Sequence, residues 1–212
     1  ISVPTAWTAA VVLGAAALIG AFLLDRTFFV VGLSYLLLLG SYSVWLKHSA
    51  ILDVLAIAFG FVLRALAGSV VLHVPFSHWL LVLTLLLALF LATAKRRAEL
   101  VALAGGATSH RPSLEHYSLP MLDQMLSVVM ACTLLAYAFY TISPETVAKF
   151  ATDHLLFTLP LPIYGLFRYL YLIHRGDSHG NPSDLLLSDR PLQLCIVLWG
   201  VLVAAIIYGP LK

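Results

Sequence analysis

The residues of this chain best suited to chemistry are charged groups at the end of an apolar stretch, LFLATAKRRAEL. Lys95, Arg96 and Arg97 are consecutive, and in a helix Glu99 shares a face with Lys95, four residues before it, and with Arg96, three before it. Adjacent cations repel one another unless anions come between them, and phosphates are anions that Lys and Arg bind. The stretch therefore predicts a phosphate-binding site. The alternative is a collar of cations that reach from the bilayer to its surface, with one internal ion pair.

A second group of charged residues lies inside an apolar stretch. Asp53 and Arg64 are eleven residues apart, and eleven helical steps of about 100° return to the same face. Because a charge at the centre of a membrane helix costs roughly 2.5–3.5 kcal/mol, such residues normally face a protein interior or a wet cavity. We expect a polar cavity wall that opens towards Tyr42 and Lys47; a structural Asp–Arg brace is the alternative. Arg168, nearer the end of a span, is expected to extend to the membrane surface.

A third group occurs in GNPSDLLLSDRPLQL, just before the last apolar run. Asp184 is placed to cap a short helix that follows Pro182, and Asp189 stands at the start of the final helix. Capping and helix-dipole effects account for one carboxylate. They do not account for an Asp–Arg pair on the side where the other basic loops emerge. Asp189 and Arg190 are therefore candidate ligand-binding residues.

The elements that must position these residues are membrane helices. The sequence is 61% hydrophobic and 10% charged, with a mean hydropathy of +0.99, whereas an average soluble domain is about 45–50% apolar and about 25% charged. The pattern predicts an all-α, polytopic transmembrane helical bundle that forms a single integral membrane domain over residues 1–212. Seven apolar runs approach the roughly 20 residues that span a bilayer, at 7–24, 28–46, 51–72, 78–94, 121–142, 154–173 and 192–208.

Basic residues are unevenly divided between the two sides of such a bundle. Seven alternating spans place seven Lys and Arg residues on the side of the long polar loops and three on the other. The positive-inside rule then puts the long loops, and the candidate site with them, in the cytoplasm. We expect a multi-pass protein of the inner (plasma) membrane. The seven residues are Lys47, Lys95, Arg96, Arg97, Arg111, Arg175 and Arg190.

Several other kinds of site are excluded by spacing. Cys132 and Cys195 lie in apolar runs without metal or disulfide spacing, and we interpret them as packing residues. The loop histidines lack the pairing of a zinc site. The sequence has no Walker loop and no nucleophile elbow, and no motif for a nucleic-acid partner.

Four segments in order carry a family resemblance: YSVWLKHSAILDVLAIAFGFVLRALAG, FLATAKRRAEL, HYSLPMLDQML and LFRYLYLIHRGDSHGNPSDLLLSDRPLQL. Together they resemble decaprenyl-phosphate phosphoribosyltransferases, which belong to the UbiA-type superfamily of intramembrane prenyltransferases. The resemblance implies a nine-helix fold around a central cavity. It also implies an aspartate-rich motif after the second helix, which holds Mg²⁺ and a diphosphate. This sequence lacks that motif and begins at what resembles the third helix.

We therefore expect two further helices and the magnesium motif upstream, no metal ligand within this chain, and no activity from these 212 residues alone. Prenyltransferases carry a second aspartate-rich motif where this sequence reads KRRAEL, which is expected for the phosphoribosyl branch. The implied reaction transfers 5-phosphoribose from phosphoribosyl pyrophosphate to a polyprenyl (decaprenyl) phosphate in the lipid bilayer. The product would serve the synthesis of cell-wall arabinan. The implied donor-site residues are Tyr42, Lys47, Lys95, Arg96, Glu99, Asp189 and Arg190, with Asp53 and Arg64 as weaker candidates.

Two other functions stay open, and so does assembly into a homo-oligomer. The first is a UbiA-type prenyltransferase that uses an allylic diphosphate donor, against which the cationic KRRAEL argues. The second is a membrane transporter in which Asp53 and Arg64 line an ion path. Matched broken helices, which are common in transporters, are not evident in the sequence.

Overall fold

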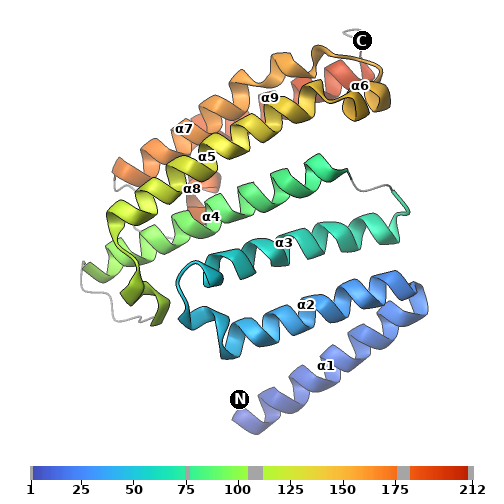
Figure 1. Ribbon diagram of the computed structural model, residues 1–212, viewed down its shortest axis with the longest axis vertical. Coiled ribbons are helices and arrows are strands. Elements are labelled where there is room, and N and C mark those ends of the chain that lie inside the picture. The colour runs from blue at the N-terminus through green and yellow to red at the C-terminus, as the bar shows by residue number, and fades with distance from the viewer. Residues whose placement is uncertain (1, 75–76, 105–111, 176–181, 210–212) are drawn as a thin grey trace. The chain divides into compact units, whose positions relative to one another are not determined.

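The computed structural model describes residues 2–74, 77–104, 112–175 and 182–209, and every regular element among them is helical (Figure 1). The predicted all-α class is therefore confirmed for the described residues. Three short 3₁₀ helices, Leu46–His48, Pro112–His116 and His154–Thr158, accompany the α-helices. The α-helices are α1 (Val3–Leu24), α2 (Arg26–Val44), α3 (Leu52–Val71), α4 (His78–Ala104), α5 (Leu119–Ile142), α6 (Pro144–Phe150), α7 (Pro160–Arg175), α8 (Pro182–Ser188) and α9 (Arg190–Tyr208).

Seven helical segments in the described part of the chain are long and apolar enough to cross a membrane, as predicted. They are α1 to α5, α9, and α7 together with the 3₁₀ helix before it. The largest difference from the predicted runs concerns α4, which continues past residue 94 to Ala104. The whole KRRAEL segment is consequently helical. Its side chains are presented at fixed angular intervals rather than from a loop.

Local sequence signals set where several helices begin. The side chains of Asp25, Ser118, Ser143 and Asp189 each accept a backbone N–H in the first turn of the helix that follows. In α5, α6 and α9 a proline also stands in the first turn, where it removes no intrahelical hydrogen bond. The expected short helix after Pro182 is present as α8, while the expected capping role of Asp184 lies outside the described side chains.

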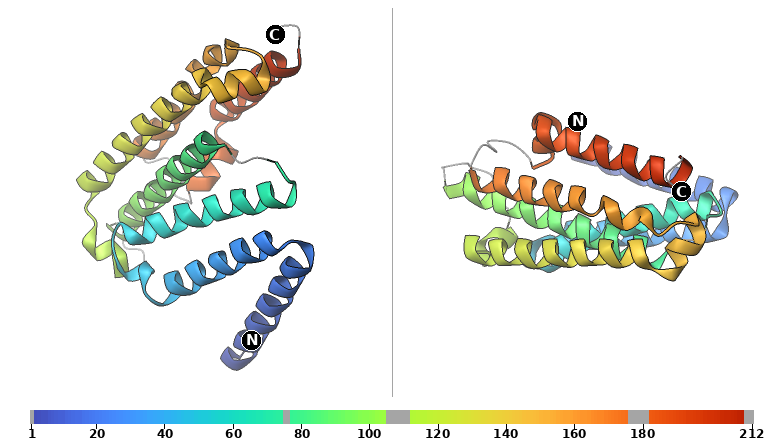
Figure 2. Two further views of the ribbon diagram at one scale, coloured as in Figure 1. Left: turned by 45° about the vertical axis from the view of Figure 1, so that its right-hand side comes forward. Right: turned by 90° about the horizontal axis from the view of Figure 1, so that it is seen from above.

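The chain divides into two compact units, Ile1–Leu85 and Leu86–Lys212, with the boundary inside α4. In the first unit, α2 packs against both α1 and α3, and the views in Figures 1 and 2 show α2 and α3 side by side. Three of the six residues that α3 buries are small, namely Ala56, Ala58 and Gly60. Small residues let membrane helices approach closely. The prediction of one domain over 1–212 stays a prediction.

The second unit is built around α5, α7 and α9, with the C-terminal part of α4 and the short α8. Its core includes Phe90 of α4 and Tyr169 of α7, whose ring centroids are 5.5 Å apart. The remaining buried members are Ala94, Leu126, Val129, Met130, Leu172, Ile173, Leu185 and Leu192. This core ends next to the charged residues described below, so the same packing that buries it also fixes the helix ends that carry them.

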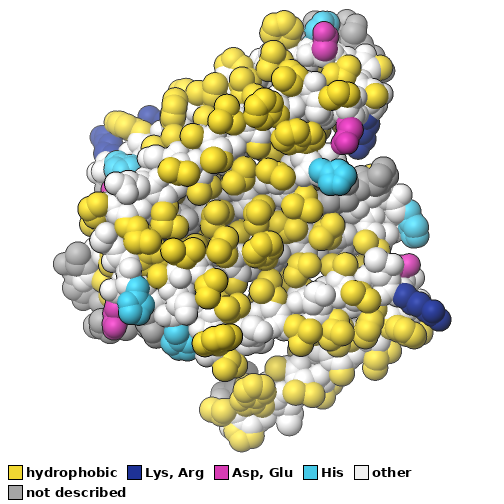
Figure 3. All heavy atoms as spheres, viewed as in Figure 1, with side chains coloured by type: hydrophobic (Ala, Val, Ile, Leu, Met, Phe, Trp, Pro, Cys, Tyr) yellow, Lys and Arg dark blue, Asp and Glu magenta, His cyan; other side chains and the backbone are white. Residues whose placement is uncertain are grey.

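Large apolar side chains also cover the outside of the helices. Figure 3 shows hydrophobic side chains over most of the visible face, with charged groups near helix ends. On α1 the one buried residue is Ala21, whereas Leu13 and Leu23 are 70% and 79% exposed. Helices that are apolar on their outer surface are stable in lipid, where their backbone groups are satisfied internally. The described residues form a multi-pass membrane protein.

Candidate functional site

The cationic turn of α4 presents its three cations in three different environments. Lys95 is exposed. The Arg96 side chain is only 1% exposed, and its Nη1 donates to Glu99 Oε2 at 2.5 Å. The predicted internal ion pair therefore exists, and of the two cations that share a face with Glu99 it is Arg96 that pairs with it. A guanidinium buried this deeply needs a charge partner, because an uncompensated buried charge is strongly destabilising.

Arg97 leaves α4 in another direction and joins it to two further helices. Its Nε donates to Asp123 Oδ1 in α5 at 2.5 Å, and its Nη1 donates to the carbonyl oxygen of Ile173 in α7 at 3.2 Å. His174 Nε2 lies 3.3 Å from the same Asp123 oxygen. The ends of α4 and α7 and the start of α5 therefore meet in one polar cluster. We call this cluster, formed by Arg97, Asp123, Ile173 and His174, the Asp123 junction.

Arg168 and Asp189 form a second interhelical ion pair. Arg168 Nη2 lies 2.8 Å from Asp189 Oδ1, and Nε lies 3.1 Å from Oδ2, so the contact has two points. The same carboxylate caps α9 by accepting Leu192 N–H at 3.1 Å. The Arg168 guanidinium is the main cause that holds the pKa of Asp189 below its ordinary value of 3.8. The expectation that Arg168 extends to the membrane surface stays a prediction; the carboxylate that it reaches, Asp189, stands just outside the last span.

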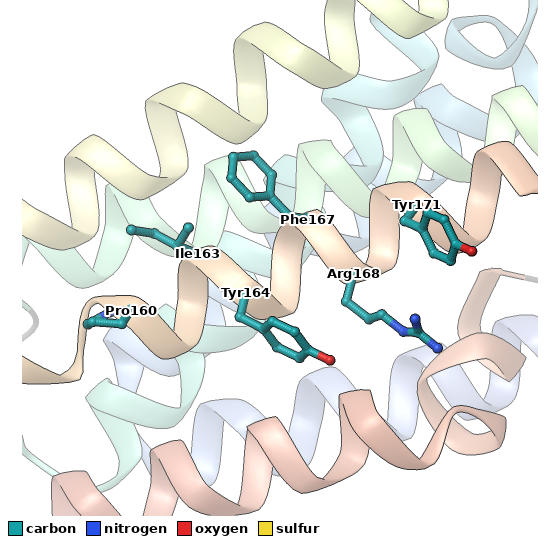
Figure 4. Close-up of a pocket in the computed structure, with 6 residues that line it drawn as sticks. All are labelled: Pro160, Ile163, Tyr164, Phe167, Arg168 and Tyr171. Carbon is teal, nitrogen blue, oxygen red and sulfur yellow. The ribbon is translucent and has the colours of Figure 1, made fainter.

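An open hollow of about 540 Å³ runs along the surface of α7 beside this ion pair (Figure 4). The figure shows Tyr164 and Arg168 on one side of the helix and Phe167 on the other. The Arg168 guanidinium also lies 5.3 Å from the centre of the Tyr171 ring. Because its one cation is already paired to a carboxylate, this mostly apolar surface suits an apolar chain better than a phosphate.

In the first unit, Tyr42, Lys47 and Asp53 belong to three consecutive pieces of chain: the last turn of α2, the 3₁₀ helix Leu46–His48, and the first turn of α3. Asp53 is fully buried, and its Oδ1 accepts the N–H of Val54 at 2.8 Å. A carboxylate in the first helical turn is favoured by the helix dipole. Tyr42 and Lys47 are half-buried. These residues lie on or beside the connection between α2 and α3, and their predicted role as one wall of a site stays a prediction.

This connection has an unusual backbone. Ile51 has φ 68° and ψ −49°, and the N–H of Leu52 donates to the carbonyl of Ala50 at 2.8 Å. The geometry is that of a γ-turn with positive φ, which is rare and strained. A β-branched residue in such a conformation costs on the order of 1–3 kcal/mol and persists where the surroundings enforce it, often at functional sites. The turn directly precedes the helix that carries Asp53.

Arg64 lies much deeper along α3 than Asp53. Eleven residues on one continuous helix separate the two residues by roughly 16 Å along its axis, beyond the reach of a direct ion pair. Arg64 instead donates through Nε to the hydroxyl of Tyr35 at 3.0 Å and also contacts that hydroxyl through Nη2. A direct Asp–Arg brace is therefore wrong. A cavity of about 110 Å³ adjoins Arg64, Tyr35 and Tyr42.

The predicted site residues thus fall into two sets. Tyr42, Lys47, Asp53 and Arg64 lie in the first unit, and Lys95, Arg96, Glu99, Asp189 and Arg190 lie in the second. Within the second set, Glu99 pairs with Arg96 and Asp189 pairs with Arg168, while Arg190 is exposed. One shared donor site for both sets stays a prediction.

The described residues do not fit a magnesium site. No three His, Cys, Asp or Glu side chains among them gather closely enough to hold a metal ion. Three carboxylates of the second unit, those of Glu99, Asp123 and Asp189, each accept a hydrogen bond from an arginine. Magnesium prefers carboxylates that keep oxygens open beside several water ligands. The expected Mg²⁺ is therefore assigned to none of these side chains.

Comparison with known proteins identifies the family. The model of the UbiA prenyltransferase family matches residues 1–188. This chain belongs to the UbiA prenyltransferase family. The resemblance seen in the sequence is thereby confirmed at the level of the family, whose members are membrane enzymes.

Relatives of this UbiA-family chain carry a more specific name. A decaprenyl-phosphate phosphoribosyltransferase of Mycobacterium tuberculosis is 31% identical over 207 residues, which are 96% of this chain and 67% of the relative. The protein of that name from Mycolicibacterium smegmatis is 29% identical over 210 residues, covering 96% and 65%. The one from Corynebacterium glutamicum is 28% identical over 183 residues, covering 84% and 53%. This chain thus spans between about half and two-thirds of the length of these relatives.

Asp123 was not among the predicted site residues, and the partner of Arg168 was not predicted. Both lie within predicted apolar runs, 121–142 and 154–173, and an ionisable residue inside a span is by default a candidate for a specific partner. The criterion that singled out Asp53 and Arg64 would have found them. What the sequence could not supply was the partner, because Arg97 and Asp123 are 26 positions apart and Arg168 and Asp189 are 21 apart.

Proposed function

We propose that this UbiA-family protein transfers 5-phosphoribose from phosphoribosyl pyrophosphate to the phosphate of a polyprenyl (decaprenyl) phosphate, releasing pyrophosphate. The observation that carries the proposal is the helical turn Lys95–Arg96–Arg97. Three cations stand there at the position where a prenyltransferase has its second aspartate-rich motif, whose carboxylates would bind a metal-bound diphosphate. The printed names of the relatives from M. tuberculosis, M. smegmatis and C. glutamicum support the same reaction.

The donor carries a diphosphate and a separate 5-phosphate, and cations are the complementary groups. Lys95 is exposed and offers an ammonium to the donor, while Arg96 is held in an ion pair with Glu99 and adds positive charge beside it. Arg190 adds an exposed cation at the start of α9. Tyr42, Lys47, Asp53 and Arg64 of the first unit remain candidate donor-binding residues on the family resemblance alone.

The proposed reaction does not require a strong general base. An oxygen of the acceptor phosphate, already anionic near neutral pH, attacks the anomeric carbon of the ribose. The bond from that carbon to the pyrophosphate oxygen breaks, and pyrophosphate leaves with the bonding electrons. The protein residues would then act by orienting the two substrates and by stabilising the charge that develops on the leaving group. Magnesium, when bound, would neutralise part of the diphosphate charge.

The membrane setting fits a lipid acceptor. The apolar tail would remain among the helices while its phosphate reaches the polar loops. We place the protein in the plasma membrane with these loops in the cytoplasm, where the basic residues gather. The lipid-linked phosphoribose would then supply precursors of cell-wall arabinan.

A transfer assay tests the proposal. Membranes that contain the complete gene product carrying these 212 residues are mixed with labelled phosphoribosyl pyrophosphate, decaprenyl phosphate and Mg²⁺. We expect label to move into the organic phase. The variants Lys95→Gln and Arg96→Gln should lower the transfer strongly, whereas Lys149→Gln, at the exposed end of α6, should not. Equal transfer by all variants would contradict a donor site at this turn.

The family description itself favours one second candidate, a prenyltransferase that uses an allylic diphosphate. Geranyl diphosphate with an aromatic acceptor forms the second arm of the assay. Prenyl transfer without phosphoribosyl transfer would replace the proposed reaction by this one.

A further inference from the structure

We propose that Asp123 is a positioning residue that fixes the rotation of α4 through Arg97 and thereby presents the exposed Lys95 to the donor while Arg96 stays in its ion pair with Glu99. Its effect on donor binding rests on the proposed function. The geometry of the Asp123 junction rests on the contacts alone. Asp123 itself would not touch the substrate.

The first step concerns what Arg97 holds. Its side chain is 12% exposed and uses two nitrogens, Nε towards Asp123 of α5 and Nη1 towards the Ile173 carbonyl of α7. Ile173 lies within the last turn of α7, where carbonyls have no partner further along the helix. Arg97 therefore contacts a carbonyl of the last turn of α7 with one part of its guanidinium and a carboxylate of α5 with another.

The second step concerns how many groups depend on Asp123. Its Oδ1 faces both Arg97 Nε at 2.5 Å and His174 Nε2 at 3.3 Å. The other ring nitrogen of His174 lies 2.9 Å from the Leu170 carbonyl. Asp123 Oδ1 is thus the shared partner of Arg97 from α4 and His174 from α7.

The third step links the junction to the cations before it. Consecutive helical residues point about 100° apart, so fixing the direction of Arg97 also fixes those of Arg96 and Lys95. With Arg97 tied to Asp123, Arg96 is directed to its buried pairing with Glu99 and Lys95 is left exposed. Without the carboxylate, Arg97 would be a second unneutralised cation beside Lys95 in the same turn, repelling it and competing with it for the donor phosphates.

The test is the substitution Asp123→Asn in the complete gene product, purified in detergent or nanodiscs. Three quantities are measured: the Kd for phosphoribosyl pyrophosphate by calorimetry, KM and kcat for the transfer, and the thermal unfolding midpoint. We expect Kd and KM for the donor to rise about tenfold, which corresponds to about 1.4 kcal/mol. The kcat at saturating donor should stay close to that of the wild type, because Asp123 makes no contact with the reacting atoms.

Matched variants separate positioning from simple stability. Asp123→Glu, which keeps the charge, should restore part of the donor affinity. Asp153→Asn makes the same chemical change at a carboxylate that is 82% exposed, and it should leave Kd unchanged. In the double variant Arg97→Gln with Asp123→Asn, the loss of affinity should be much less than the sum of the single losses, because both changes remove one interaction.

Two results would overturn the role of Asp123, and both can be told apart from a result that overturns the proposed function. A lower unfolding midpoint with unchanged Kd and KM would make the junction merely structural. If the wild type neither binds nor uses phosphoribosyl pyrophosphate, the proposed function fails, and hydrogen exchange then decides the junction. Asp123→Asn should accelerate amide exchange in residues 93–97 and 170–173. Unchanged exchange in those segments would show that Asp123 does not hold α4.

Discussion

Arg168 of α7 and Asp189, the residue that precedes α9, are joined at two points, Nη2 to Oδ1 at 2.8 Å and Nε to Oδ2 at 3.1 Å. The Asp189 side chain is 11% exposed and also caps α9. The Asp189 carboxylate thus binds Arg168 of α7 and also caps the N-terminus of α9. Asp189, which the sequence predicts as a ligand-binding residue, therefore already binds Arg168 and the N–H of Leu192.

Substitutions at Asp189 should separate its two roles. Asn can still cap a helix but carries no charge, so Asp189→Asn should weaken only the contact with Arg168. Asp189→Ala should lose a further ~1 kcal/mol with the cap. Thermal unfolding of the purified protein measures both. Ser118→Ala, which removes only the cap of α5, is the matched control. Equal destabilisation by the Asn and Ala variants would show that the cap contributes nothing.

The same ion pair predicts how stability depends on pH. Because Arg168 lowers the pKa of Asp189 in the folded protein, folding is favoured while the carboxylate is ionised. This contribution is fully present above the ordinary value of 3.8 and is lost as the pH falls through the lowered folded value. The difference in unfolding midpoint between wild type and Asp189→Asn should therefore be constant above that value and shrink below it. A difference that grows on acidification would contradict the assignment.

Asp53 and Arg64 should behave as independent residues. They lie roughly 16 Å apart along α3, and substitutions at such distances usually add within about 0.3–0.5 kcal/mol. A double-mutant cycle with Asp53→Asn and Arg64→Gln, read by thermal unfolding, measures the coupling. The pair Arg64→Gln and Tyr35→Phe, which share a hydrogen bond, serves as the coupled comparison. Strong coupling between Asp53 and Arg64 would reinstate the brace.

A polar chain at the opposite end of α5 should affect stability without affecting activity. Trp199 donates to the Tyr137 hydroxyl at 2.8 Å, and this hydroxyl pairs with Thr158 at 2.5 Å. Tyr137→Phe should cost about 1–3 kcal/mol because it leaves the Trp199 N–H without its acceptor. Tyr137 lies roughly 21 Å along α5 from Asp123, so KM and kcat should be unchanged. Tyr208→Phe, at an 87% exposed tyrosine, is the control.

Much of the fold could be read from local sequence. The number of membrane helices followed from apolar run length, since a bilayer demands long segments whose backbone is satisfied internally. The start of α9 followed from the Asp189–Arg190–Pro191 sequence, because a capping carboxylate and a proline in the first turn are local effects. The true end of α4 did not follow from hydropathy, since a helix continues beyond the bilayer wherever its polar residues find partners.

The sequence by itself determined that this is a helical membrane protein of the UbiA type and that its cations gather at residues 95–97. Only the tertiary structure decided which basic residues form ion pairs, and with which carboxylates. Arg97 meets Asp123, and Arg168 meets Asp189, because packing of the core brings the ends of separate helices together. A one-dimensional pattern records the charge of each residue. The energy of an ion pair depends on a distance between atoms, and folding alone sets that distance.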